Sequence, residues 1–522
     1  MSINLLLNNR FIIIFFAPLL LGAFTVFTFQ PFNITFLNFI IIPLLFLILA
    51  YVRKKSRNIY RKKPFLKNLF FIGYFFGIGF FFTGTYWISY SLTFDESFRF
   101  LIPFSLILIP LFLGTFFGLA TLVSGYFIKN NIHSILIFCS SFALMDFLRS
   151  KILTGFPWNL WAYSWSWFPE ILQILNPIGL FAFNLLTLTI FCAPLFIVVK
   201  KTKLGIFIFF LTTLMFFFNY IYGSFVLNKS ESIAKNNNQF LNIKVVSPNF
   251  NLKYNLSIKD LDVLLDNLIK YSEPAKNKKT IFIWPEGVFA GHSFDGIKNF
   301  KNKFQKHFSK DHIIILGVNT VEENPYKIYN SLIAVNNNFE IIYQYNKIKL
   351  VPFGEFLPLE KYFYKFGLKK ITEGVNSFSN GTIQKNFKHN NANILPLICY
   401  EIIFTDLIQK IDKDTNLIIN ISEDAWFGGS IGPYQHFSKA IFRAIESNIF
   451  IARSANQGVS AFISNNGLVI KNLKPNERGN IEYNIPILAN KIRNKNDLIF
   501  FILLITYVFI FFILRKLNND KK

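Results

Sequence analysis

Long apolar stretches dominate both ends of the chain and are separated by short polar or basic segments. Seven of them precede residue 223, and an eighth lies near the C-terminus. Most reach the ~20 residues that a helix needs to span a bilayer, although the fifth is shorter. The pattern predicts a polytopic α-helical membrane bundle of about eight helices. Their approximate ranges are 11–29, 34–52, 69–90, 100–128, 134–148, 179–199, 204–222 and 498–514.

The pattern changes to short apolar runs between residues 240 and 485. These runs have the length of strands, and segments with helical spacing fall between them, which predicts an α/β layered domain. The predicted strands are 243–246, 280–284, 312–318, 331–335, 340–344, 394–398, 416–421, 449–453 and 459–463. The predicted helices are 258–271, 296–308 and 435–447. Asn466-Gly467 after the last of these strands is a hairpin signal.

Together the two patterns predict the domain organisation. We expect a membrane domain at 1–222, a soluble domain at 223–497, an eighth transmembrane helix at 498–514 and a tail at 515–522. Composition agrees, because 52% hydrophobic and 18% aromatic residues are typical of an integral membrane protein. No small-x-small cleavage site follows the first apolar stretch, so we interpret it as a retained helix rather than a signal peptide.

The net charge of +25 is explained by topology rather than by nucleic-acid binding. Basic residues gather at 53–67, at 200–203 and in the tail, whereas the loops at 30–33 and 91–99 hold only Arg99. Arg149 and Lys151 run against this trend but are outnumbered. The positive-inside rule then places both termini in the cytoplasm and the soluble domain outside the inner membrane, in the periplasm of a diderm bacterium.

Three ionisable residues stand where predicted strands end: Glu286, Lys347 and Cys399. Strand ends of an open α/β sheet gather at one rim, where sites form. A carboxylate there can deprotonate a thiol, and an ammonium can stabilise an oxyanion. We expect Cys399 to be exposed at a strand-to-helix turn, where nearby backbone N–H groups lower a thiol pKa. Each residue alone also has an ordinary structural interpretation, as a small core residue or a solvated charge.

Four tryptophans crowd the segment 150–178, namely Trp158, Trp161, Trp165 and Trp167. Tryptophan favours the headgroup zone of a membrane. The segment is either an interfacial anchor or a wall beside an active site that admits lipid, and the sequence leaves both open. Neither metal-ligand spacing nor a phosphate-binding loop is present, and three cysteines do not make a disulfide framework.

Several longer motifs point to a known family. In chain order they are Thr154-Gly155-Phe156-Pro157-Trp158-Asn159-Leu160, Trp284-Pro285-Glu286, Tyr345-Asn346-Lys347-Ile348-Lys349-Leu350-Val351-Pro352-Phe353-Gly354-Glu355, Cys399-Tyr400-Glu401, Asn420-Ile421-Ser422-Glu423-Asp424-Ala425-Trp426-Phe427-Gly428 and Arg453-Ser454-Ala455-Asn456. The Glu-Lys-Cys signature resembles the nitrilase (carbon–nitrogen hydrolase) superfamily, and the other motifs are similar to its membrane branch, the apolipoprotein N-acyltransferases. The resemblance covers nearly the whole chain.

The resemblance implies an α-β-β-α sandwich fold and a role for each matching residue. Glu286 is then the general base, Lys347 the oxyanion stabiliser and Cys399 the acylated nucleophile. It also implies that Glu355 supports the triad and that Tyr400 and Glu401 flank the nucleophile and shape the pocket. No metal or organic cofactor is implied. The chain departs from the family pattern at Gly287-Val288-Phe289 and at Gln457, where pocket shape or lid contacts could differ.

The implied reaction has a phospholipid as acyl donor and a diacylated apolipoprotein as acceptor, and gives a triacylated lipoprotein. We expect the enzyme to be a monomer. Water must be kept from the thioester, so Trp426, Phe289 and Phe294 are candidates for a hydrophobic lid or substrate pocket. His436 could form a catalytic Cys–His dyad with Cys399, but it could equally well be a buried structural histidine. The alternatives are a membrane-tethered amidase that hydrolyses a periplasmic amide, and a non-catalytic transporter or scaffold.

Overall fold

The computed structural model describes residues 9–59, 65–129, 131–199, 203–235, 239–254, 256–358, 377–382, 385–409, 412–488 and 497–519. The chain divides into two compact units, residues 1–225 with 495–522, and residues 226–494. Parts of the predicted basic segments, 60–64 and 200–202, lie outside the described residues.

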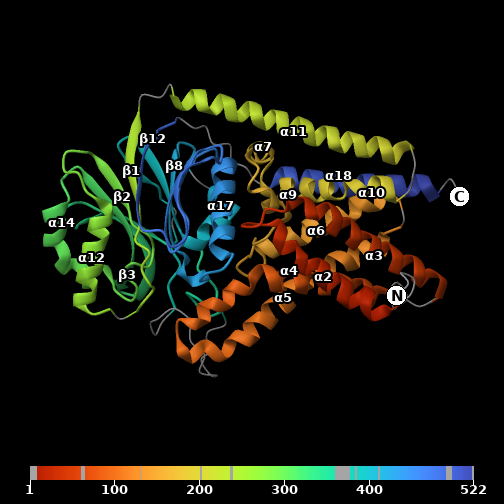
Figure 1. The fold of residues 1–522 in the computed structure, drawn as a ribbon, viewed down its shortest axis with the longest axis horizontal. Helices are drawn as coiled ribbons and strands as arrows, with labels where there is room; N and C mark the ends of the chain where they lie inside the picture. Colours follow the sequence, from red (N-terminus) through yellow and green to blue (C-terminus); the bar gives the residue numbers. More distant parts are fainter. Residues whose placement is uncertain are drawn as a thin grey trace. The chain divides into compact units, whose positions relative to one another are not determined.

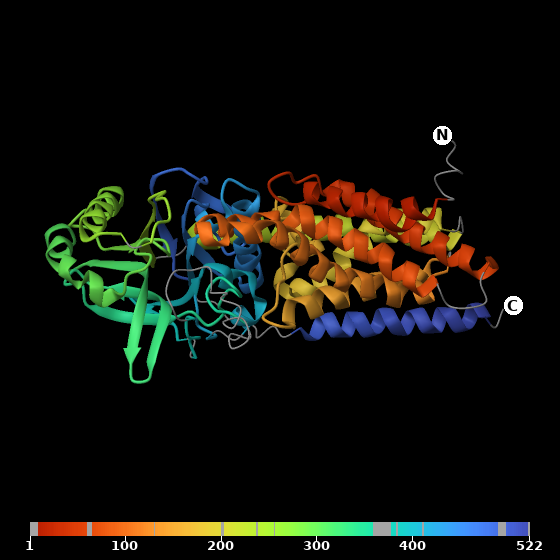
Figure 2. The ribbon, with the colours of Figure 1, turned by 90° about the horizontal axis from the view of Figure 1, so that it is seen from below.

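The first unit is helical, and all eight predicted apolar stretches contain helix. Figure 2 shows α18 beside the other helices of this unit. The main helices are α2 (Ala17–Phe24), α3 (Asn38–Ile59), α4 (Phe65–Thr85), α5 (Ile102–Phe127), α6 (His133–Lys151), α9 (Leu180–Phe191), α10 (Ala193–Val198), α11 (Lys203–Lys235) and α18 (Leu498–Asn519).

Only five helices in the described part of the chain are long and apolar enough to cross a membrane, fewer than the predicted eight. The first stretch mixes π-, α- and 3-10 helix within Ile12–Thr28. The fifth carries charged residues on α6. The sixth breaks between α9 and α10, where Pro194 lacks the N–H that would continue the helix. Five of the eight predicted stretches are therefore helices long enough to span a bilayer, and the other three are helical but shorter, charged or interrupted.

The second unit holds two six-stranded sheets. The strand order is β12-β1-β2-β3-β4-β5 in one sheet and β11-β10-β9-β8-β7-β6 in the other. Their bounds are β1 Phe240–Ser247, β2 Thr280–Ile283, β3 His312–Glu323, β4 Tyr326–Val335, β5 Ile341–Asn346, β6 Phe387–His389, β7 Ala392–Ile398, β8 Leu417–Glu423, β9 Phe450–Asn456, β10 Ser460–Ile463, β11 Val469–Leu473 and β12 Gly479–Pro486. In Figure 2 the β3–β4 hairpin extends beyond the rest of its sheet.

Helices cover the outer faces of the two sheets. Figure 1 shows α12 (Ile258–Ser272) and α14 (Lys301–His307) on the first sheet and α17 (Gly432–Ser447) on the second. A capping box between Ser257 and Asp260 begins α12. The layers are therefore helix, sheet, sheet and helix, which agrees with the α-β-β-α sandwich that the sequence implied.

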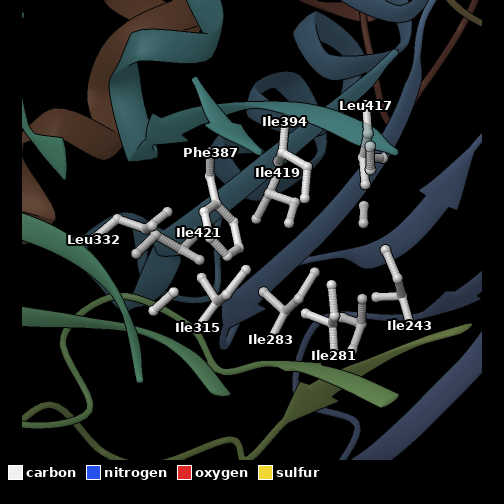
Figure 3. Close-up of a cluster of buried hydrophobic side chains, with 14 of the residues drawn as sticks. Ile243, Ile281, Ile283, Ile315, Leu332, Phe387, Ile394, Leu417, Ile419 and Ile421 are labelled. Atoms are coloured by element: carbon white, nitrogen blue, oxygen red, sulfur yellow. The ribbon is translucent and has the colours of Figure 1, made fainter. Parts of the chain in front are cut away.

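The core of this unit lies between the sheets. Its side chains are mostly branched aliphatic residues from the inner faces of both sheets, which interdigitate in Figure 3. The labelled members are Ile243, Ile281, Ile283, Ile315, Leu332, Phe387, Ile394, Leu417, Ile419 and Ile421. A second apolar cluster packs the first sheet against α12 and α14.

All nine predicted strands have a counterpart in the structure, and the differences have local causes. The prediction missed β6, β12 and the first half of β4, where polar residues hide the apolar pattern. The predicted helix 296–308 is divided into α13 (Phe294–Ile297), a 3-10 turn and α14. Pro396 lies inside β7 because β6 pairs only with Ala392–Ile394, beyond which the ladder on that side has ended.

Candidate active site

Ends of strands from both sheets carry the three predicted catalytic residues. Glu286 follows β2 and Lys347 follows β5, both in the first sheet, whereas Cys399 follows β7 in the second. The expectation of one rim of one open sheet was therefore wrong. β2 and β5 run in the same direction, so their carboxyl ends lie at the same edge.

Lys347 is fully buried between two carboxylates. Its Nζ lies 2.8 Å from Glu355 Oε1 and 3.5 Å from Glu286 Oε1. Burial alone would lower the pKa of Lys347, but the charges of Glu286, Glu355 and Cys399 outweigh it and raise this pKa above its ordinary value. Lys347 therefore stays an ammonium, as an oxyanion stabiliser must.

Asn330 joins the same two carboxylates and was not predicted from the sequence. Its Nδ2 donates to Glu286 Oε1 and to Glu355 Oε1, each at 2.7 Å. The other oxygen of Glu286 accepts the backbone N–H of Glu423 at 3.0 Å, and the other oxygen of Glu355 accepts that of Val351 at 2.8 Å. Asn330 lies in the polar half of β4, before the apolar run that marked this strand in the sequence.

Cys399 is 8% exposed, not exposed as expected. It has a positive φ of 50° and begins a 3-10 helix, Cys399–Ile403. Burial is the largest cause that raises the pKa of its thiol well above the ordinary value, and the charge of Glu286 adds to it. The charge of Lys347 acts the other way. The expected lowering was therefore wrong, and the thiol needs a base to become a nucleophile.

Glu401 binds the backbone just before Cys399 and the backbone just after Lys347. Its Oε2 accepts the N–H of Ile398 at 2.9 Å, and its Oε1 accepts the N–H groups of Ile348 and Lys349 at 2.7 and 3.0 Å. Burial raises the pKa of Glu401, although these N–H groups oppose the rise. The side chain thus ties the strand end that carries Cys399 to the segment after Lys347. Tyr400, next to it, is half-buried.

His436 lies in a separate buried cluster with Asp424 and Arg453. Its Nδ1 is 3.0 Å from Asp424 Oδ1, and Arg453 donates to Asp424 Oδ2 at 2.9 Å. Ser422 donates to Asp424 Oδ1 at 2.6 Å. Burial lowers the pKa of His436. This arrangement favours the structural interpretation of His436 over a pair with Cys399.

Glu423 packs against the turn that follows Glu286. Both of its carboxyl oxygens accept the side-chain amide of Asn456, at 3.0 and 2.9 Å. Burial raises the pKa of Glu423 well above its ordinary value. A Cβ at Gly287, where φ is +77°, would lie 2.5 Å from Glu423 Oε2. The departure from the family pattern at Gly287 is therefore a close approach that only glycine allows.

The three lid candidates lie in different surroundings. Phe289 and Phe294 are buried in the apolar cluster between the first sheet and its covering helices, so packing accounts for both. Trp426 is half-buried, with its ring centroid 6.4 Å from that of Tyr254. The lid hypothesis is retained for Trp426 alone. Among the described residues, no group of three or more His, Cys, Asp or Glu side chains could hold a metal ion.

In the helical unit the tryptophan-rich segment is mostly interior. Trp158, Trp161 and Trp165 are at most 1% exposed, which does not fit an anchor in the headgroup zone. Arg149 holds this segment, because it donates to the carbonyl oxygens of Phe156 and Trp158 at 2.6 and 2.8 Å. Its charge is buried in this way, which explains why it departs from the positive-inside trend.

A salt bridge inside the helical unit completes this connection. Arg149 donates to Asp146 Oδ1 at 2.9 Å, and Asn184 of α9 donates to Asp146 Oδ2 at 3.0 Å. The Oδ1 of Asn184 accepts the backbone N–H of Ala162 at 3.0 Å. The three side chains therefore join α6, α9 and the tryptophan-rich segment.

Known proteins match both parts of the chain. Residues 21–193 match the family described as apolipoprotein N-acyltransferase N-terminal domain, and residues 255–489 match carbon-nitrogen hydrolase. An apolipoprotein N-acyltransferase of Rhizobium etli is 31% identical over 90% of this chain and 89% of its own. Its counterpart in Rickettsia prowazekii is 32% identical over 90% and 91%. A solved CN-hydrolase superfamily protein from Xanthomonas campestris is 16% identical over 47% of this chain and 91% of its own, with a TM-score of 0.35.

Both matched families agree with the motifs and with the sandwich that positions Glu286, Lys347 and Cys399. The relatives also match over nearly their full length as well as over that of this chain. The chain belongs to the apolipoprotein N-acyltransferase family.

Proposed function

We propose that this protein moves an acyl chain from a membrane phospholipid, through a thioester on Cys399, to the N-terminal α-amine of a diacylglyceryl-modified apolipoprotein. The observation that carries the proposal is the buried site in which the ammonium of Lys347 lies between the carboxylates of Glu286 and Glu355, while the charge of Cys399 is one of the causes that raise the pKa of Lys347. Family membership supports the acyl transfer, and the geometry supports the role of each residue.

In the first half-reaction, Glu286 takes the proton of the Cys399 thiol. The thiolate attacks the ester carbonyl, and the ammonium of Lys347 stabilises the oxyanion that forms. When the intermediate collapses, the ester C–O bond breaks and Glu286 returns the proton to the leaving alcohol. The products are an acyl thioester on Cys399 and a lysophospholipid.

In the second half-reaction, the α-amine of the acceptor attacks the thioester carbonyl. Lys347 again stabilises the oxyanion, and Glu286 takes a proton from the attacking nitrogen. The C–S bond then breaks, the amide is released and the proton returns to the Cys399 sulfur. Splitting an ester-to-amide exchange in this way replaces one difficult step by two easier ones. Glu355, Tyr400 and Glu401 support the triad, and Trp426 shields the thioester.

The membrane topology is part of the proposal. We infer about eight crossings, both termini in the cytoplasm, a periplasmic catalytic domain and a monomer. The test is labelling with a membrane-impermeant maleimide in cells, after Cys139, Cys192 and Cys399 are replaced by alanine. Single cysteines are then placed at exposed positions by Lys388→Cys in the catalytic domain and Lys516→Cys near the C-terminus. We expect label at position 388 in intact cells but at 516 only after permeabilisation, and the opposite pattern would contradict the orientation.

Intact mass of the purified protein after incubation with phospholipid tests the chemistry. We expect a gain of one acyl chain in the wild type and in the matched control Cys139→Ala, but not in Cys399→Ala. A diacylated lipopeptide should then discharge the adduct. Equally fast discharge by water would indicate an amidase-like hydrolase instead. Absence of any adduct on folded wild type, with several phospholipids, would contradict the proposal and favour a non-catalytic role.

A further inference from the structure

We propose that Asn330 is a positioning residue of this site, whose side-chain amide holds Glu286 and Glu355 together so that Glu286 can exchange protons with Cys399. The inference rests on the proposed function for the identity of the base. The motifs described in the sequence do not include Asn330, and the structure places it in the site.

The contacts form a closed ring of two donors and two acceptors. Asn330 Nδ2 lies 2.7 Å from the Oε1 atoms of both Glu286 and Glu355, and Lys347 Nζ lies 3.5 and 2.8 Å from the same two atoms. An amide nitrogen has two hydrogens, so Asn330 uses both. Glu286 Oε1 lies 2.7 Å from Asn330 Nδ2 but 3.5 Å from Lys347 Nζ, so Asn330 makes the shorter hydrogen bond to the proposed base.

The neutral charge of the amide matters in this setting. Two carboxylates already face one ammonium, so an aspartate at position 330 would add a third negative charge to a buried site. Carboxylates accept but cannot donate when ionised, so an aspartate would also leave both oxygens without this donor. An asparagine satisfies the oxygens without changing the charge balance that keeps Lys347 protonated.

The backbone of Asn330 reinforces the arrangement. Its carbonyl oxygen accepts the N–H of Lys347 at 2.9 Å, so one residue holds Lys347 through the main chain and both glutamates through the side chain. Oε1 of Glu286 faces Asn330 and Lys347, and its Oε2 accepts the backbone N–H of Glu423 at 3.0 Å. These contacts on both oxygens fix the plane of the carboxylate. We infer that proton exchange uses the second lone pair of Oε2.

Substitutions that separate shape from hydrogen bonding test the inference. Asn330→Asp preserves size and removes both donors, Asn330→Ser keeps one donor, and Asn330→Ala keeps none. We expect Asp and Ala to slow thioester formation by about 10- to 100-fold, within the range of acid–base catalysis, and Ser to lie between them and the wild type. The phospholipid concentration at half-saturation should not change, because Asn330 acts through the base. Asn242→Asp is the matched control, since Asn242 also donates to a glutamate, Glu482, at 2.8 Å but lies outside the site.

A purely structural role predicts that the rates of the three variants follow their loss of thermal stability rather than the number of hydrogen-bond donors they keep, and that result would overturn the inference. So would rates within twofold of wild type for all three variants. Alkylation of Cys399 by iodoacetamide at pH 8 provides a readout that needs no lipid, and we expect Asp and Ala to slow it. If wild type forms no thioester, the proposed function fails, and unchanged alkylation in Asn330→Asp would separately overturn the role of Asn330.

Discussion

Asp424→Asn tests whether the buried cluster of Asp424, His436 and Arg453 stabilises the unit of residues 226–494. Asp424 and Arg453 have fully buried side chains and meet at 2.9 Å. Burial would raise the pKa of Asp424, but Arg453, His436 and the hydrogen bonds to it prevail and lower its pKa from 3.8 to about 2. A lowering of this size corresponds to ~2.4 kcal/mol of stability at neutral pH.

The substitution should therefore destabilise the domain by about 2–4 kcal/mol. The upper end reflects the buried guanidinium of Arg453 that remains without its counter-charge. For a unit of this size each kcal/mol lowers Tm by about 2 °C or more, so we expect a fall of about 5 °C. Because the pKa is lowered on folding, the stabilisation is complete above pH ~4 and is lost as the pH falls through about 2.

Thermal unfolding in detergent at pH 3 to 8 is the measurement. Asp406→Asn is the matched control, because its ion pair with Lys349 at 3.1 Å is partly exposed and should contribute under ~1 kcal/mol. We expect the gap between wild type and Asp424→Asn to be constant from pH 5 to 8 and to narrow below pH 4. A Tm equal to that of the control, or a gap independent of pH down to 3, would refute the reasoning.

Three further substitutions probe the site and its surroundings. Ser422→Ala removes the hydroxyl that donates to Asp424 Oδ1 at 2.6 Å and helps to lower the pKa of Asp424, so the Tm at neutral pH should fall, and an unchanged Tm would contradict this role. Gly287→Ala places a methyl group 2.5 Å from Glu423 Oε2 at a φ of +77°, so we expect a loss of about 1–3 kcal/mol and slower thioester formation; wild-type Tm and rate would contradict the close approach. Trp426→Ala should raise hydrolysis of the thioester relative to transfer several-fold, measured as free fatty acid against acylated peptide, and an unchanged ratio would exclude the lid role.

The location of Glu286, Lys347 and Cys399 at strand ends could be predicted from the sequence, whereas the burial and the contacts of these residues could not. Glu286, Lys347 and Cys399 follow apolar runs whose ends are visible in the sequence, so their places at strand ends could be predicted. That Cys399 is buried, and that its thiol pKa is raised, depends on packing between two sheets, which no local pattern records. Asn330 could not be predicted because pairing with β3, rather than apolar spacing, makes its segment a strand.

The positions of the helical segments could likewise be predicted, whereas the interruptions within them could not. Apolar content located all eight stretches, but the break before Pro194 and the charges on α6 show that composition does not fix a continuous span. The tryptophans of the 150–178 segment suggested a membrane interface, whereas three of them are interior. Their burial depends on partners in distant helices, as in the stacking of Trp165 on Phe191, which the local sequence does not reveal.

The buried pair of Asp146 and Arg149 bears on how the helical unit is made. Both residues lie towards the C-terminal end of α6, so each costs less to insert than the roughly 2.5–3.5 kcal/mol of a charge at the centre of a lone helix. Asn184, which completes the pair, is synthesised 38 residues after Asp146. In the proposed topology, α6 would therefore commit to the bilayer only once α9 has emerged from the ribosome. Glycosylation mapping of truncated chains should show poor insertion of α6 alone and efficient insertion when α9 is present, and equal insertion of both chains would refute this order of biogenesis.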